Sequence, residues 1–266
     1  MSTASILLLG AIAGLTIFVG LPMGRYRSTS PALRASLSAL ATGILVFLFW
    51  DVMSNGVDPI ESNIRGHHWW VFAGEAALLS LGFAAGLMSL VYYDHWMQHQ
   101  RAAPLEQPSW LQSLTPGHRL AVLIATGIGL HNFGEGLAIG QSAASGELSL
   151  ALVLIIGFGL HNTTEGFGIV GPMSGEVELP SWRFLGAMGL IGGGPTFLGT
   201  VVGQAWVSPA LGVVFFAAAG GSILYVVMQL FEVCKRFGMP KLVGWTLLIG
   251  MLLGFATDWV LVAAGA

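Results

Sequence analysis

Long apolar runs recur along almost the whole chain. A membrane-spanning helix needs about 20 predominantly apolar residues. Charged residues make up only 9% of the 266 residues, whereas about 25% is usual in soluble domains. We therefore expect an all-α polytopic membrane protein, with a single transmembrane domain over residues 1–266. Eight stretches qualify as spans: 4–24, 34–54, 69–93, 118–142, 148–172, 182–206, 209–234 and 242–264.

The connections between these spans set the expected orientation. Two are long: 55–68 is expected to be a polar, turn-rich loop, and 94–117 a flexible cytoplasmic loop between the third and fourth helices. Basic residues mark the cytoplasmic side of a membrane protein. Apart from Arg65, all of them fall in or beside the odd-numbered loops, so we expect both termini outside. These residues are Arg25, Arg27, Arg34, Arg101, Arg119, Arg183, Lys235, Arg236 and Lys241.

The start of the chain favours a retained helix over a cleaved signal peptide. No basic region precedes its first apolar run, which is about twenty residues long. The net charge of −3 gives no support to a nucleic-acid partner.

One polar pattern occurs twice in the middle of apolar segments. Residues 131–136 read His-Asn-Phe-Gly-Glu-Gly, and residues 161–166 read His-Asn-Thr-Thr-Glu-Gly. Histidine and glutamate four residues apart lie on one face of a helix. Such groups are costly at lipid depth unless they meet one another or a cation. A short loop joins the two spans, so we expect antiparallel neighbours with the two motifs at one depth.

Imidazole nitrogen and carboxylate oxygen are typical ligands of zinc and its first-row neighbours. The side chains of His131, Glu135, His161 and Glu165 would complete one site, and two carboxylates would balance a divalent charge. The carbonyl oxygens of Asn132 and Asn162 could join the glutamates in a second site. The alternative is that histidine and glutamate pair only with each other and hold the helices together.

Other polar residues near span ends suggest a route for ions. Asp51, Glu75 and Asp258 all fall on the expected outer side, where together they would form an acidic entrance that concentrates cations. Gln229 and Glu232 lie toward the expected inner end of the seventh span, where they could line an exit.

The two motifs resemble signatures of a known family. Residues 131–140, His-Asn-Phe-Gly-Glu-Gly-Leu-Ala-Ile-Gly, are similar to the fourth-helix signature of the ZIP (Zrt/Irt-like) metal transporters, and 161–166 to the fifth-helix signature. The bacterial, GufA-like branch is the most similar. Eight helices, outside termini and a long connection after the third helix agree with this family.

The resemblance implies uptake of a divalent metal, often zinc, through a site between the fourth and fifth helices of a bacterial inner-membrane protein. It implies a binuclear centre in some members. The implied metal ligands are His131, Asn132, Glu135, His161, Asn162 and Glu165.

The chain departs from the family pattern at several positions. Gly134 and Thr164 stand where GufA-like members often have proline, Gly194-Pro195 replaces a Glu-Pro pair on the sixth helix, and Gln229 replaces an acid on the seventh. Without the sixth-helix acid, we expect one tightly held metal and at most a weak second site. We also expect Gly194→Glu to add a ligand.

We therefore expect a transporter that moves a divalent cation into the cytoplasm, and not an enzyme. Zinc is the expected substrate, although these ligands also admit iron, manganese, cobalt and cadmium. The expected partners are the metal ion and membrane lipid, with a homodimer left open. Two alternatives use the same residues: an intramembrane metalloenzyme, such as a hydrolase that uses a metal-bound water, and a metal sensor that transports nothing.

Overall fold

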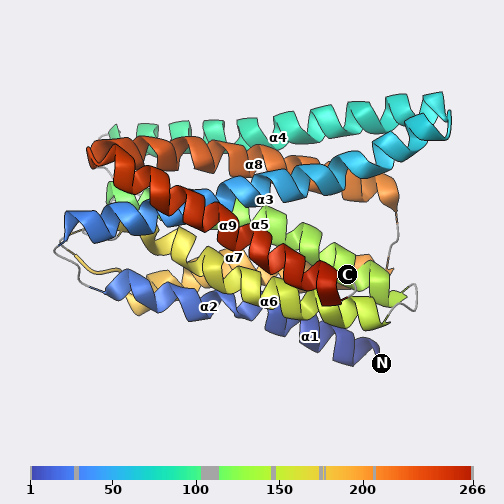
Figure 1. The fold of residues 1–266 in the computed structure, drawn as a ribbon, viewed down its shortest axis with the longest axis horizontal. Coiled ribbons are helices and arrows are strands. Elements are labelled where there is room, and N and C mark those ends of the chain that lie inside the picture. Colours follow the sequence, from blue (N-terminus) through green and yellow to red (C-terminus); the bar gives the residue numbers. More distant parts are fainter. Residues whose placement is uncertain are drawn as a thin grey trace.

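The regular elements are all helical in the residues that the computed structural model describes, which are 2–26, 30–102, 114–144, 148–173, 176, 178–205 and 208–264. The long helices run along the long axis of the molecule, and both termini lie at the same end (Figure 1). The α-helices are α1 (Thr3–Leu15), α2 (Ile17–Gly20), α3 (Pro31–Arg65), α4 (Trp69–Ala102), α5 (Pro116–Ala144), α6 (Leu148–Val170), α7 (Trp182–Ala205), α8 (Pro209–Arg236) and α9 (Pro240–Ala264). Two short 3₁₀ helices, η1 (Leu21–Arg25) and η3 (Gly171–Met173), follow α2 and α6.

Helical structure is confirmed for all eight expected spans. In the described part of the chain, seven segments are long and apolar enough to cross a membrane. The remaining expected span, 148–172, forms α6 but is not among these seven segments. Its crossing of the membrane stays a prediction. The protein is therefore an all-α polytopic membrane protein. The seven segments are Thr3–Arg25, Pro31–Arg65, Trp69–His99, Pro116–Ala144, Trp182–Ala205, Ala210–Arg236 and Pro240–Val260.

The expected loop over 55–68 is wrong, because α3 continues as a helix to Arg65. Its 35 residues span about 52 Å, well beyond the roughly 30 Å of a bilayer core. Asn55 and Asn63 lie in this stretch, and each donates a side-chain hydrogen bond to the carbonyl oxygen four residues earlier. Pro59 lies inside this helix, where it has no N–H group to donate to the carbonyl oxygen of Asn55.

The expected loop over 94–117 is also shorter than predicted. Helix α4 continues through 94–102, and α5 already begins at Pro116. Asp94 stabilises this extension, since its Oδ2 accepts hydrogen bonds from Gln98 Nε2 at 3.0 Å and from the hydroxyl of Tyr225 on α8 at 2.7 Å. Residues 103–113 lie outside the described part of the chain.

Helix α5 is the most enclosed span, and it packs against α6, α7 and α8. Its contact with α7 is the most extensive in the molecule. Glycine makes this approach possible. A Cβ atom on Gly136 would collide with the carbonyl oxygen of Thr196, and one on Gly199 would collide with that of Phe133. The polar motif on α5 is therefore held at the centre of the bundle.

Candidate metal site

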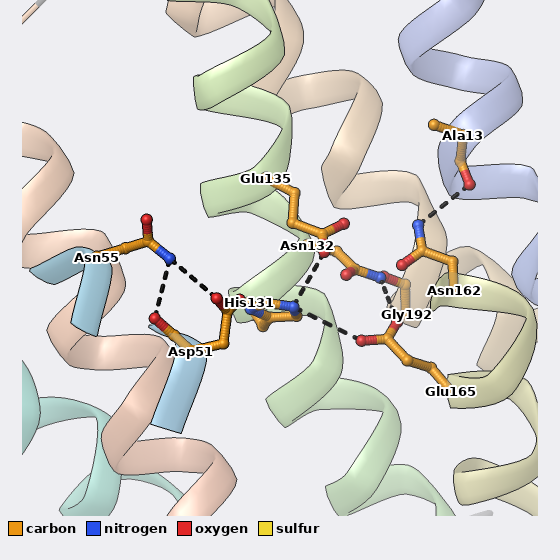
Figure 2. A network of polar contacts seen from close by, with 9 residues as sticks. All are labelled: Ala13, Asp51, Asn55, His131, Asn132, Glu135, Asn162, Glu165 and Gly192. Carbon is orange, nitrogen blue, oxygen red and sulfur yellow. Dashed lines mark hydrogen bonds and ion pairs between the residues drawn. The ribbon is translucent and has the colours of Figure 1, made fainter. Parts of the chain in front are cut away.

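Helices α5 and α6 bring the two motifs together as antiparallel neighbours (Figures 1 and 2). His131, Asn132 and Glu135 come from α5, and Asn162 and Glu165 come from α6. All five side chains are at most 4% exposed. The expected depth match between the motifs is confirmed, because residues 33 positions apart in the sequence make direct contact.

The imidazole of His131 lies between the two carboxylates. Its Nε2 is 3.1 Å from Oε1 of Glu135, one helical turn away, and 3.7 Å from Oε1 of Glu165 on α6. Figure 2 shows the three side chains pointing toward one another. A positive charge at this point would be attracted to two carboxylates from different helices, in surroundings that exclude water.

Asn132 joins α5 to both neighbouring helices. Its Nδ2 donates to Glu165 Oε2 and to the carbonyl oxygen of Gly192 on α7, each at 3.0 Å. Both partners are acceptors, so the amide nitrogen and not the oxygen must face them. These two hydrogen bonds fix the orientation of the Asn132 amide, so that its Oδ1 faces neither of the two acceptors.

Asn162 is oriented in the same way by the first span. Its Nδ2 donates to the carbonyl oxygen of Ala13 at 3.1 Å. That carbonyl group lies just before Thr16, where the first span is divided into α1 and α2. The Thr16 hydroxyl donates to the same carbonyl oxygen at 2.6 Å, and a threonine that bonds back to its own helix commonly bends it. The break thus lies beside the site.

Two buried amide oxygens are left with no hydrogen bond from the described residues: Oδ1 of Asn132 and Oδ1 of Asn162. A buried acceptor without a donor is costly, and a bound cation would satisfy it. Together with the imidazole and two carboxylates, these oxygens form a donor set that fits a divalent first-row metal.

The described side chains do not form a finished coordination shell. No group of three or more described His, Cys, Asp or Glu residues is arranged to hold a metal ion. The imidazole and the carboxylates contact one another directly, so a metal would have to displace these contacts. The backbone of the expected ligand His161 lies in α6, but its side chain lies outside the described residues.

The structure brings Asp51 and Asp258 toward the site and leaves Glu75 apart. Asp51 on α3 lies close enough to interact electrostatically with His131 and with Asp258 on α9. Figure 2 shows Asp51 beside His131, with Asn55 donating to its Oδ1 at 3.3 Å. Glu75 instead accepts a hydrogen bond of 2.7 Å from Asn63, twelve residues beyond Asp51 on α3.

Gln229 and Glu232, the expected exit residues, line a cavity of about 450 Å³ at the end of the bundle away from the termini. Asp94 and Gln98 from α4 also line this cavity, as do Arg119 and Glu176. Sequence patterns did not single out Glu176, whose Oε1 accepts from the backbone N–H of Gly117 at 2.9 Å.

The surroundings of Gly194 argue against the expectation that Gly194→Glu adds a metal ligand. A Cβ atom on Gly194 would meet no described atom within 4 Å, whereas one on Gly192 would meet Ile17, Ile169 and Ile128 in the core. Gly194 is 200° around α7 from Gly192, so it faces away from the site. A glutamate at position 194 would therefore start on the side of α7 away from Gly192.

Comparison of the chain with protein-family models and with curated proteins gave no match. Function must therefore be inferred from the site itself. That site is a buried cluster of one imidazole, two carboxylates and two amides at the centre of an all-α polytopic membrane protein.

Proposed function

We propose that this protein transports a divalent metal cation, with zinc as the first candidate, through the site between α5 and α6. One observation carries the proposal: His131, Glu135 and Glu165 meet in the centre of the bundle beside two amide oxygens that receive no hydrogen bond from the described residues. Ionisable groups inside a membrane bundle mark ion pathways far more often than they serve packing. The resemblance to ZIP transporters supports the same function.

The polar residues suggest a route through the protein. A cation is first attracted by Asp258 and Asp51, which interact electrostatically with each other, while Asp51 also interacts with His131. It then exchanges its water for the imidazole nitrogen and the oxygens of Glu135 and Glu165. Two carboxylates neutralise a divalent ion, which removes the charge penalty of the dry interior. The cation leaves through the cavity that Gln229 and Glu232 line.

Passage requires α5 and α6 to change their contacts. In the observed arrangement Asn132 ties α5 to α6 and α7 at once, and His131 contacts both carboxylates. A metal that binds the carboxylates replaces these contacts, so its arrival favours a different packing of the helices. Movement of helix groups around a central site is the usual basis of alternating access.

The test is metal accumulation in sealed proteoliposomes. The unmodified protein should fill the vesicles with zinc, whereas a Glu135→Gln, Glu165→Gln double variant should lose uptake and still insert and purify as a folded protein. Glu75→Gln is the matched control, because Glu75 is also buried but lies apart from the site. Metal binding without accumulation would instead indicate an enzyme or a sensor.

A further inference from the structure

Helices α8 and α9 share a turn but do not pack side by side. They are joined by residues 237–239, where Gly238 has a φ of +65° and Pro240 begins α9. Both helices pack against α3, and they diverge from the turn toward the other end of the bundle (Figure 1). The divergence leaves a wedge between two membrane-spanning helices.

The wedge contains a cavity of about 440 Å³, which is within the usual size of a ligand pocket. Its wall is apolar except at the rim. Gly244 keeps it open on the α9 side, because a Cβ atom there would meet nothing within 4 Å. The residues that form the wall include Phe231, Cys234, Met239, Val243 and Leu247, with Lys235 at the rim.

Two lysines lie at or beside the rim of this wedge. Lys235 lines it, and Lys241 lies next to Pro240 in the first turn of α9. Arg236, which ends α8, lines the cavity of Gln229 and Glu232 instead. Glu232 pairs with Lys235 at 2.6 Å, and Lys241 adds a further positive charge at the start of α9. The N-terminus of α9 adds the positive end of its helix dipole. The rim therefore suits a phosphate group.

We propose that this wedge is a binding site for one anionic phospholipid. An acyl chain fills the apolar wall between α8 and α9, and the phosphate lies at Lys235, Lys241 and the start of α9. A lipid is the occupant because the wedge opens between two spans, so that only the bilayer can supply a ligand with both an apolar chain and a charged head group at this depth. Basic pockets between membrane helices recognise anionic head groups in this way.

The experiment measures lipid retention by native mass spectrometry of the purified, detergent-solubilised protein, titrated with phosphatidylglycerol or phosphatidylcholine. We expect one phosphatidylglycerol to bind more tightly than phosphatidylcholine. The double variant Lys235→Gln, Lys241→Gln should lose about 25-fold in phosphatidylglycerol affinity and little in phosphatidylcholine affinity, since each basic residue near a lipid surface contributes about fivefold.

A second variant tests the apolar wall. Gly244→Leu should fill the wedge and weaken retention of both lipids. Gly186→Leu on α7 is the matched control, because a side chain at Gly186 also enters open space and lies away from the wedge. Equal affinity for the two lipids, or equal lipid retention by the Gly244→Leu and Gly186→Leu variants, would overturn the proposal.

Discussion

Asp51 and Glu75 are both acids near the expected outer side, but their surroundings differ. Asp51 interacts electrostatically with His131, whereas Glu75 is held by Asn63. We predict that Asp51→Asn with Asp258→Asn raises the half-saturating metal concentration severalfold, most strongly at low salt, because attraction of a cation in solution toward these acids is screened as ionic strength rises. Glu75→Gln should change it little. Uptake measured over a range of metal concentrations checks this, and equal effects would mean that Asp51 and Asp258 do not attract the cation.

Coordination of the metal by His131 predicts that uptake depends on pH. A protonated imidazole cannot coordinate a metal, so protons compete with the cation for the site. At metal concentrations below saturation, zinc uptake should fall as the pH drops from about 7.5 to about 5.5. A flat profile would argue against ligation by histidine, and rising uptake would indicate proton coupling.

The sequence predicts the centre of the site better than its surroundings. Spacing of four residues on a helix and a short connection are enough to bring His131, Glu135 and Glu165 together. The backbone partners of Asn132 and Asn162 were not predictable, since Gly192 and Ala13 contribute only carbonyl groups from distant spans. Every residue has a backbone carbonyl group, so the residue type does not show which one will accept a hydrogen bond. The break at Thr16 also lies inside a uniformly apolar run.

At the scale of helices, their existence was predictable and their ends were not. Apolar length reports where a helix is inside the bilayer, but α3 and α4 continue well beyond their apolar parts. Asn55, Gly56 and Pro59 are typical of turns, yet here the asparagine bonds back to its own helix and the chain stays helical to Arg65. Turn propensity is a weak guide where packing against a neighbouring helix continues.

The contact between α5 and α7 depends on glycine, so a larger residue in this contact should separate the two helices. Gly136→Val should force α5 away from α7, because its side chain would collide with the carbonyl oxygen of Thr196. Separation of these helices would also weaken the hydrogen bond from Asn132 to Gly192. We expect a loss of about 1–3 kcal/mol in stability together with loss of transport.

Thermal unfolding of the purified variant, followed by circular dichroism, measures the effect of Gly136→Val. Gly186→Val is the control, because its position on α7 is open and a valine there should change the unfolding temperature little. Equal unfolding temperatures for the two variants would show that close packing of α5 and α7 does not stabilise the bundle.

At the scale of the molecule, the basic residues and the chain termini gather at opposite ends of the helix bundle. Both termini and the α3–α4 turn lie at one end, and the turn between α8 and α9 lies at the other. Arg65 is the one described basic residue at the first end, since the other described Lys and Arg residues are in or beside the opposite connections. The rule that basic residues stay in the cytoplasm therefore predicts that the termini lie outside.

Labelling of single cysteines tests this orientation and the crossing of α6 together. Cys234 is the only cysteine, so Cys234→Ala gives a clean background. Ser62→Cys and Glu178→Cys place exposed thiols before α4 and after α6, with three helices between them. An impermeant maleimide should label Ser62→Cys in intact cells and Glu178→Cys only after permeabilisation. Reversed labelling would invert the proposed direction of transport, whereas labelling of both thiols in intact cells would mean that one of these three helices does not cross the membrane.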